Sequence, residues 1–522
     1  MFIQLLLSSL AILSSLHPDP RFVHAIPTVN GTTANGQQDD YEQPPNKIAL
    51  VRVDPSKTFQ IFDGMGFAEA FRRCKIIYGS DGLSPANTEK VLDLLFSNTT
   101  GAGLTILRNG IGSASKFMYD WMVSIAPTSP GASGAEMTYQ WDGDDNGQVK
   151  MTKDALARGA KMIYADAWSA PGYMKNNNND SGGGSLCGVR NVTCASGDWR
   201  KPFAEYLVQY LKYYKQEGIT IDHVGFLNEP EQNTTYASML STGEEAADFL
   251  KILYPILQAS GLSTTIGCCD GEGWEGTREQ LAGLQKEGAE DTLGIVTTHG
   301  YTSSPGAPFN TTKRVWQTEW ADLMSPTTQA WYNSGSPGEG FTWAVNIHNA
   351  FVNSNVSAFL YWIGAGGTTT NSALILLHKD EVIVSKRLWA FAQYSRLIRP
   401  GARRIDATVV GISASSLRSS NKSPTTLVPR YAQPPQAELY ASAFMNPDSS
   451  IVIHVINNSD VAICVDVQGV DTKKRIVTRY LTNEANDFTK MNSSSMAGGG
   501  CDMEVGGLIE KRSMMGITVG MT

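Results

Sequence analysis

Short apolar and β-branched segments recur along the chain up to Arg399, and helical or loop-like stretches separate most of them. Such segments are typical of buried strands, and strands that alternate with helices pair in parallel. Eight strand–helix units in succession predict a closed (β/α)8 barrel, or TIM barrel, of the α/β class. The eight expected barrel strands are Ile61–Phe67, Leu104–Arg108, Met162–Trp168, His223–Asn228, Thr264–Cys268, Ile295–His299, Arg314–Glu319 and Ala358–Trp362.

The intervening helices can be recognised where the apolar spacing changes to three and four residues. Between Lys201 and Gly218 the aromatic and leucine residues follow this spacing, and Gly218 is a natural helix end. Long stretches rich in Gly, Asn and Asp separate the second and third expected strands. Loops of that length on a barrel rim usually shape the substrate site.

The pattern changes after Arg399-Pro-Gly401, where short strands follow one another between Asn, Gly, Ser and Pro turns. This is typical of an all-β domain. An early strand at Lys47–Asp54 has no place in the barrel and could complete this β-sandwich. We therefore predict a catalytic barrel over residues 59–399 and a side domain made of residues 47–58 and 400–522. The expected side-domain strands are Ala407–Ile412, Leu439–Phe444, Ile451–Ile456, Ile463–Val467, Ile476–Leu481 and Met515–Val519.

The first 46 residues predict export from the cell. An apolar run over Phe2–Leu16 is too short to span a bilayer and is followed by the small-residue pattern Val23-His-Ala25. We predict a signal peptide over residues 1–25, with a membrane anchor or a core helix as the alternatives. Residues 26–46 are polar and are expected to form a flexible leader.

Glycosylation sequons and cysteines support a secreted, extracellular glycoprotein. Seven cysteines fit an oxidising compartment, and we expect the disulfides Cys187–Cys194 and Cys464–Cys501. The pairing of Cys74, Cys268 and Cys269 stays open, because one thiol must remain. Ten Asn-x-Ser/Thr sequons begin at Asn30, Asn98, Asn179, Asn191, Asn233, Asn310, Asn355, Asn421, Asn457 and Asn492.

Charge and histidine content limit the partners. The formal net charge of −8 argues against nucleic acid or an anionic membrane as the main partner. A metal site is the rival explanation of the cysteines, but the chain has no CxxC spacing and only seven histidines. We expect no metal, and a monomer.

Two glutamates carry the candidate chemistry. Glu229 stands in Phe226-Leu-Asn-Glu-Pro230, and Glu319 stands in Val315-Trp-Gln-Thr-Glu-Trp320, each at the end of an expected strand. A TIM barrel builds its active site at the C-terminal ends of its strands, and two facing carboxylates are the catalytic pair of a retaining glycoside hydrolase. Trp320 would add an aromatic wall for sugar stacking. The alternative, two surface glutamates in loops, is disfavoured by their places on the fourth and seventh strands.

The chain resembles glycoside hydrolase family 30 of clan A, in particular its fungal xylanase and glucuronoxylanase subfamily. The resemblance runs through nearly the whole chain in the expected order. The segments that carry it are FDGMGFAEAF (62–71), LTILRNGIG (104–112), ADAWSAPGYMK (165–175), GFLNEPEQ (225–232), TTHGY (297–301), VWQTEW (315–320), AFLYW (358–362) and SRLIRPGARRI (395–405).

The resemblance implies a (β/α)8 barrel with a fused β-sandwich, Glu229 as general acid/base and Glu319 as nucleophile. It also implies that Arg73, or the adjacent Arg72, grips the glucuronic acid branch of glucuronoxylan through paired charged hydrogen bonds. The alternative for Arg73 is a solvated side chain or a rim ion pair. Further positions that match the family's active site are Arg108, Trp168, Asn228, His299, Tyr301 and Trp362.

These observations predict a secreted endo-β-1,4-glucuronoxylanase whose partner is a polysaccharide and which needs no cofactor. The alternatives are a xylanase or xylobiohydrolase without glucuronate dependence, and a hydrolase of another β-glycan. A non-catalytic carbohydrate-binding protein is a remote alternative, because such a protein would be expected to have lost Glu229 or Glu319. The acidic residues expected to support the site from nearby strand ends are Glu69, Asp166, Glu231 and Asp270.

Overall fold

The computed structural model describes residues 47–78, 82–116, 122–414, 437–473, 475–492 and 501–521. The expected signal peptide and leader, and the sequons at Asn30 and Asn421, lie outside the described residues. Within these ranges no helix has both the length and the apolar character that a membrane span requires. The expected division of the chain at residues 58 and 399 remains a prediction.

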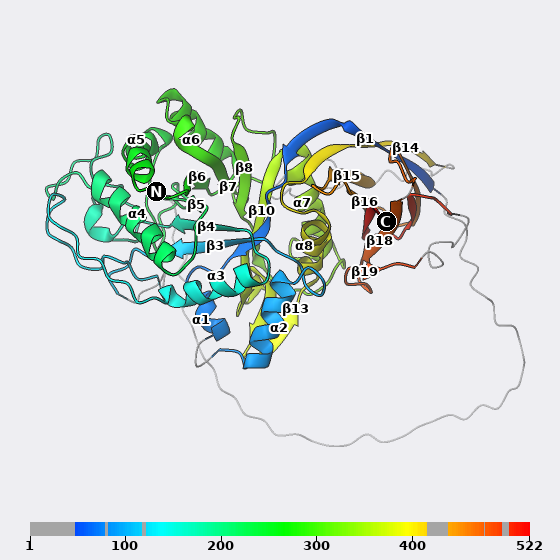
Figure 1. Ribbon diagram of the computed structural model, residues 1–522, viewed down its shortest axis with the longest axis horizontal. Coiled ribbons are helices and arrows are strands. Elements are labelled where there is room, and N and C mark those ends of the chain that lie inside the picture. The colour runs from blue at the N-terminus through cyan, green and yellow to red at the C-terminus, as the bar shows by residue number, and fades with distance from the viewer. Residues whose placement is uncertain are drawn as a thin grey trace, which may run out of the picture. The chain divides into compact units, whose positions relative to one another are not determined.

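Among the described residues, eight parallel strands close into a barrel, because β10 pairs with both β2 and β8 (Figure 1). This confirms the predicted fold class. β8 has the predicted bounds, whereas β5 ends at Val224, short of the expected Asn228. The barrel strands are β2 (Gly64–Ala68), β3 (Ile106–Ile111), β4 (Met162–Ala167), β5 (His223–Val224), β6 (Thr265–Gly271), β7 (Leu293–His299), β8 (Arg314–Glu319) and β10 (Val356–Gly366).

The helices of the described residues connect these strands and pack their apolar sides on the barrel. In α4 the expected aromatic residues Phe203, Tyr206, Tyr210 and Tyr214 are all buried, which confirms the spacing argument. The helices are α1 (Arg73–Tyr78), α2 (Pro85–Phe96), α3 (Gln148–Ala157), α4 (Arg200–Gln216), α5 (Gly243–Ala259), α6 (Trp274–Lys286), α7 (Gly340–Asn353) and α8 (Lys386–Leu397).

Two small groups of strands follow the late barrel strands. β12 (Ala373–His378) extends the barrel sheet from β10, and β13 (Glu381–Val384) pairs antiparallel with it. β9 (Asp322–Pro326) directly follows β8 and pairs with β11 (Thr370–Asn371). The β9 segment therefore stands at the rim beside Glu319.

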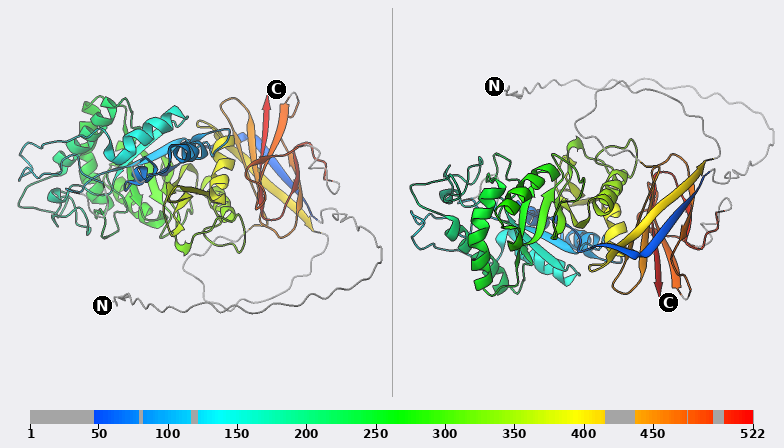
Figure 2. Two further views of the ribbon diagram at one scale, coloured as in Figure 1. Left: turned by 90° about the horizontal axis from the view of Figure 1, so that it is seen from below. Right: turned by 90° about the horizontal axis from the view of Figure 1, so that it is seen from above.

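A second sheet forms the β-sandwich domain. β1 pairs antiparallel with β14, from Lys47↔Ala414 to Ile61↔Arg403, and parallel with β17. In Figure 2 the blue β1 and the yellow β14 run side by side. In the described residues the sheet has nine strands: β1 (Lys47–Ile61), β14 (Arg403–Ala414), β15 (Leu439–Met445), β16 (Ile451–Asn457), β17 (Ile463–Gln468), β18 (Arg475–Thr482), β19 (Thr489–Lys490), β20 (Gly506–Ile509) and β21 (Ser513–Met521).

Strand β16 shows how this sheet joins the barrel. Successive side chains of a strand point to opposite faces. Ile453 and Val455 pack in the core of the sandwich, whereas Val452 and Ile456 belong to the core that continues into the barrel. His454 lies on the second face and contacts the carbonyl of Gln393 in α8 at 2.7 Å. Because both faces of β16 are covered, the strand is buried along its whole length.

The disulfides of the described residues are Cys187–Cys194, Cys464–Cys501 and Cys268–Cys269. The first two confirm the expected pairs. The open question about the remaining cysteines is resolved by the third bond, which leaves Cys74 as a buried free thiol.

Candidate active site

Glu229 and Glu319 meet at the C-terminal end of the barrel. One carboxylate oxygen of each lies within 4.8 Å of the other and of a ring nitrogen of His299. The side chains are mostly withdrawn from solvent, at 8% and 5% exposure. Although β5 is short, the backbone N–H of Glu229 donates to the carbonyl of Asp270 at 2.8 Å, and this bond fixes the glutamate at the rim.

Glu319 is held by two donors. The hydroxyl of Tyr301 donates to its Oε1 at 2.8 Å, and Nη1 of Arg108 donates to its Oε2. Burial raises the pKa of the Glu319 carboxyl above its usual value, against the positive charges of His299 and Arg108 and the Tyr301 hydrogen bond. These donors therefore favour the ionised form that burial opposes.

Arg108 is the cation at the centre of the site. Its Nη2 donates to Asp166 at 2.8 Å and to the amide oxygen of Asn228 at 2.6 Å, and its guanidinium lies over the Trp168 ring at 4.5 Å. Burial lowers the pKa of Arg108, but the charges of Glu319 and Asp166 outweigh it and raise the net value. A fully buried arginine thus stays charged between Glu319 and Asn228, the residue that precedes Glu229.

His299 links the acid side of the site to its support. Nδ1 lies 3.0 Å from Oε1 of Glu229, and Nε2 lies 3.3 Å from Oδ1 of Asp270. Burial lowers the pKa of His299, but the charge of Glu319 and hydrogen bonds to Asp270 and Glu229 dominate and raise it to about 10. At neutral pH the imidazole is therefore protonated and donates from both nitrogens.

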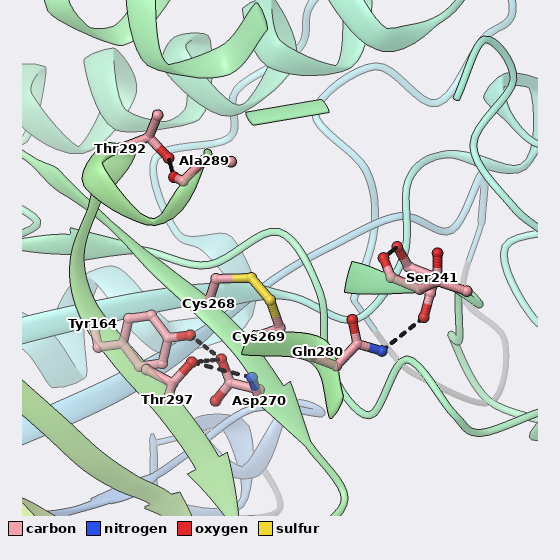
Figure 3. The surroundings of a disulfide bond; sticks show 10 residues. Tyr164, Ser241, Cys268, Cys269, Asp270, Gln280, Ala289, Thr292 and Thr297 are labelled. Carbon is pink, nitrogen blue, oxygen red and sulfur yellow. Dashed lines mark hydrogen bonds between the residues drawn. A yellow bond between two sulfur atoms is a disulfide. The ribbon is translucent and has the colours of Figure 1, made fainter. Parts of the chain in front are cut away.

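Asp270, expected from the sequence as a supporting or loop-capping group near a strand end, organises the floor of the site. Its carboxylate accepts from the hydroxyls of Tyr164, Thr297 and Thr318. Figure 3 shows Tyr164 and Thr297 converging on this carboxylate next to the Cys268–Cys269 disulfide. Burial raises the pKa of Asp270, but hydrogen bonding to His299 and the charge of Arg108 lower it overall.

A cleft of about 1730 Å³ surrounds the two glutamates. That volume exceeds the range of about 300–1,000 Å³ usual for small-molecule sites and suits a polymer. The predicted residues Arg73, Trp168, Trp320, Trp362, Glu229 and Glu319 all line it, whereas Arg108, Asn228 and His299 lie beneath the surface. Further aromatic residues along its walls, none of which was predicted from the sequence, are Phe71, Tyr236, Tyr332, Phe341 and Trp343.

Arg73 reaches the cleft with part of its hydrogen-bonding capacity in use. Nη1 donates to the carbonyl oxygens of Ala70 and Phe71, and the guanidinium lies 5.6 Å from the centre of the Trp362 ring. Behind it the buried Glu69 accepts from the backbone N–H of Ala365 at 2.9 Å. Burial raises the pKa of Glu69 to about 8 in spite of that bond and the Arg73 charge.

The described residues include one grouping with ligand spacing for a metal, and it is Glu229, His299 and Glu319 themselves. A metal ligand histidine must be neutral, with a free nitrogen lone pair. Both nitrogens of His299 already face carboxylates, and its pKa is about 10. These residues therefore fit a protonated imidazole between the carboxylates better than they fit a metal ion.

Comparisons with known proteins match both parts of the chain to glycosyl hydrolase families, 59 for the barrel and 30 for the sandwich, and a solved structure of family 30 is similar over both. A model of glycosyl hydrolase family 59 matches residues 82–392, and the model of the glycosyl hydrolase family 30 beta sandwich domain matches residues 401–483. Among solved structures, the catalytic domain of GH30 xylanase C from Talaromyces cellulolyticus is 41% identical with a TM-score of 0.79, covering 90% of this chain and 99% of that chain.

Curated relatives are more distant and carry different activities in their names. An endo-1,6-beta-D-glucanase of Trichoderma harzianum is 24% identical over 343 residues, which is 62% of this chain and 68% of the relative. A glucuronoxylanase of Bacillus subtilis strain 168 is 21% identical over 365 residues, which is 67% of this chain and 73% of the relative.

Proposed function

This chain belongs to glycoside hydrolase family 30, and on that premise we propose that it is a retaining endo-β-1,4-xylanase of the glucuronoxylanase type. The observation that carries the mechanism is the separation of the catalytic pair. Carboxyl groups of retaining enzymes lie about 5–5.5 Å apart, whereas inverting enzymes need about 6.5–9.5 Å to admit a water. Oxygens of Glu229 and Glu319 within 4.8 Å favour retention.

The reaction proceeds in two displacements. Glu229 gives its proton to the glycosidic oxygen while Glu319 attacks the anomeric carbon, so the leaving chain departs as an alcohol and the sugar becomes an ester of Glu319. Glu229, now a carboxylate, takes a proton from water, whose oxygen displaces Glu319. Both glutamates regain their starting states, and the two inversions together retain the configuration.

The surrounding groups support these steps. Arg108 and Tyr301 hold the Glu319 carboxylate ionised and aimed, through the hydrogen bonds that reach its two oxygens. The amide oxygen of Asn228 is occupied by Arg108, so its NH2 group is the end offered to a sugar 2-hydroxyl. Such a contact strengthens in the transition state.

The xylan assignment rests on the 41% identity to a GH30 xylanase and on a cleft wall that includes Arg72 and Arg73. A guanidinium there suits the carboxylate of a glucuronic acid branch. The second candidate is a β-1,6-glucan, a polymer without that carboxylate, because one of the reported relatives is an endo-1,6-beta-D-glucanase.

Product analysis separates the substrates. Wild type, Arg73→Ala and the matched neighbour Arg72→Ala are compared on glucuronoxylan, linear xylan and β-1,6-glucan. We expect wild type to cut glucuronoxylan with branch-spaced products, and Arg73→Ala to lose about tenfold or more on the branched polymer alone. A loss in Arg72→Ala instead assigns the grip to that residue, and cleavage of β-1,6-glucan alone refutes the xylan proposal.

The catalytic roles are tested with an activated aryl glycoside of the sugar that the wild type accepts. Glu229→Ala should lose about 10²–10⁴-fold on natural linkages, and azide should restore turnover on the aryl glycoside with a product of retained configuration. Glu275→Gln, an exposed glutamate on α6, is the control. Retained activity in Glu229→Ala, or an inverted product from wild type, contradicts the mechanism.

The same proposal includes export from the cell. The three disulfides of the described residues suit an oxidising compartment, and a polysaccharide of the cell wall lies outside the cell. Mass spectrometry of the protein from culture medium should find residue 26 near the mature amino terminus, with glycan on sequons. A full-length, unglycosylated protein retained in cells contradicts export.

A further inference from the structure

The cleft extends from the catalytic glutamates to the β-sandwich. Its lining includes Glu229 and Glu319, but also Tyr332 from the segment between β9 and α7, and Asn458 and Arg512 from the sandwich. The second domain therefore supplies part of the wall of the same cleft. This part of the wall plays no role in the chemistry proposed above.

Tyr332 is a half-buried aromatic side chain held in place by the sandwich. The guanidinium of Arg512 lies 4.7 Å from the centre of its ring, and the Phe341 ring meets it edge-on at 5.5 Å. The carboxylate of Glu484 accepts from the backbone N–H groups of Trp331 and Tyr332, at 2.8 and 3.2 Å. These contacts all come from outside the segment that carries Tyr332.

The neighbouring residues are fixed as well. Indole Nε1 of Trp331, at 1% exposure, donates to the carbonyl of Arg512 at 2.7 Å. The carboxylate of Glu339 accepts from the backbone N–H groups of Asn333, Ser334 and Gly335 at 2.9–3.0 Å. An aromatic ring that is already fixed before a ligand arrives loses little entropy on binding.

The apolar rim beside it points to a ligand surface. Leu323 and Met324 of β9 line the same cleft and are 40% and 90% exposed. Sugar rings present apolar C–H faces that pack on aromatic and aliphatic side chains. The charged groups of this region are already paired, since Nε and Nη2 of Arg512 donate to Asp460 and Nη1 donates to Asn458. A neutral sugar therefore fits better than an acidic one.

We propose that Tyr332, backed by Arg512, is a distal binding subsite for a neutral sugar unit of the polysaccharide chain, built jointly by barrel and sandwich. The inference rests on the proposed glycan-hydrolase function and adds a determinant of chain length. A polymer that reaches this subsite gains a contact, whereas a short substrate bound across the catalytic glutamates does not.

The test compares long and short substrates of whichever β-glycan the wild type cleaves, so a wrong xylan assignment does not disturb it. In Tyr332→Ala the ratio of kcat/KM on polymer to kcat/KM on a short aryl glycoside should fall about tenfold. Tyr332→Phe, which keeps the ring, should recover most of that loss. Tyr254→Ala on α5 removes a tyrosine of 38% exposure away from the cleft and is the matched control.

Three results would overturn the subsite. A ratio within about twofold of wild type removes the binding role, and an equal loss on both substrates indicates a structural role. A Tyr332→Phe variant that behaves like Tyr332→Ala refutes stacking on the ring. Because Tyr332→Ala also loses packing on Arg512, its melting temperature is measured, and Met324→Ala serves as a second variant. Met324→Ala should lower the same ratio by a smaller factor, since its side chain is nearly free of packing.

Discussion

Removing the hydroxyl of Tyr301 isolates one contribution to the state of Glu319. Tyr301→Phe deletes a single oxygen, which donates to Oε1 of Glu319 at 2.8 Å. The remaining donor to this carboxylate, Arg108, reaches the other oxygen. The substitution therefore leaves the charge of the site unchanged and removes one hydrogen bond to a buried carboxylate.

The expected magnitude follows from that bond. A hydrogen bond to a charged group contributes about 1.5–3 kcal/mol, and one pKa unit corresponds to about 1.36 kcal/mol. The Tyr301 bond lowers the pKa of Glu319, opposing burial, so its loss raises that pKa further. Since a nucleophilic carboxylate must be ionised, the acid limb of the kcat/KM profile should move upward by about one to two pH units.

The assay is the pH dependence of kcat/KM on an aryl glycoside, with thermal unfolding at each pH. Tyr173→Phe is the matched control, because it removes a hydroxyl that donates at 2.9 Å to the carbonyl of Ala126, away from the catalytic pair. It should leave the acid limb in place. An acid limb that does not move in folded Tyr301→Phe would refute the claim that this hydroxyl keeps Glu319 ionised.

Three further predictions concern stability. Burial raises the pKa of the Glu69 carboxyl from 4.5 to about 8. The contribution of this group to the free energy of unfolding is therefore complete below pH 4.5 and falls by about 1.4 kcal/mol per pH unit as the pH rises toward 8. Urea unfolding of Glu69→Gln should show a flatter pH dependence of stability than the wild type, and an unchanged slope would contradict this. Opening the Cys464–Cys501 disulfide, which spans 37 residues, should lower the free energy of unfolding by about 3–4 kcal/mol. Opening Cys187–Cys194, which spans seven residues, should lower it by less. The reverse order in paired Cys→Ser variants would argue against loop entropy as the source of the stabilisation. Phe444→Ala removes a ring that lies 6.1 Å from Phe62 and 6.0 Å from Phe351 and should lower the free energy of unfolding by about 3–5 kcal/mol. The control Ile476→Ala changes a side chain of 56% exposure and should lower it by less than about 0.5 kcal/mol. Equal melting temperatures of the two variants would contradict the role of these three aromatic rings in stability.

The barrel could be predicted from the sequence because each of its strands can be recognised from its own residues. Each barrel strand is a short apolar segment, and in β8 both bounds were predicted. The prediction for β5 ran too far because Gly225, Phe226 and Leu227 are also small or apolar, whereas only His223 and Val224 pair on both sides. Pairing depends on neighbours that are distant in sequence, so apolar character alone could not set that end.

The site divides in the same way. Glu229 and Glu319 could be found because each ends an apolar segment of the sequence, and closure of the barrel together with the backbone bond from Glu229 to Asp270 then brings them to one rim. A supporting place for Asp270 near a strand end was predicted, but its partners could not be found, because they are hydroxyls contributed by β4, β7 and β8. Tyr332 also gave no signal, since its partners Arg512 and Glu484 belong to another domain.

The pairing of β1 with β14 determines when this strand can fold during synthesis. Lys47 is synthesised before any barrel strand, yet its partner Ala414 follows all of them. All the barrel strands therefore leave the ribosome while β1 still lacks both of its partner strands, β14 and β17. An unpaired strand is a site for aggregation, and pairing between distant segments is slow. Once Arg403 pairs with Ile61, the segments that enter and leave the barrel are held together by strand pairing. Unfolding of the barrel from either end must therefore first break the sandwich sheet.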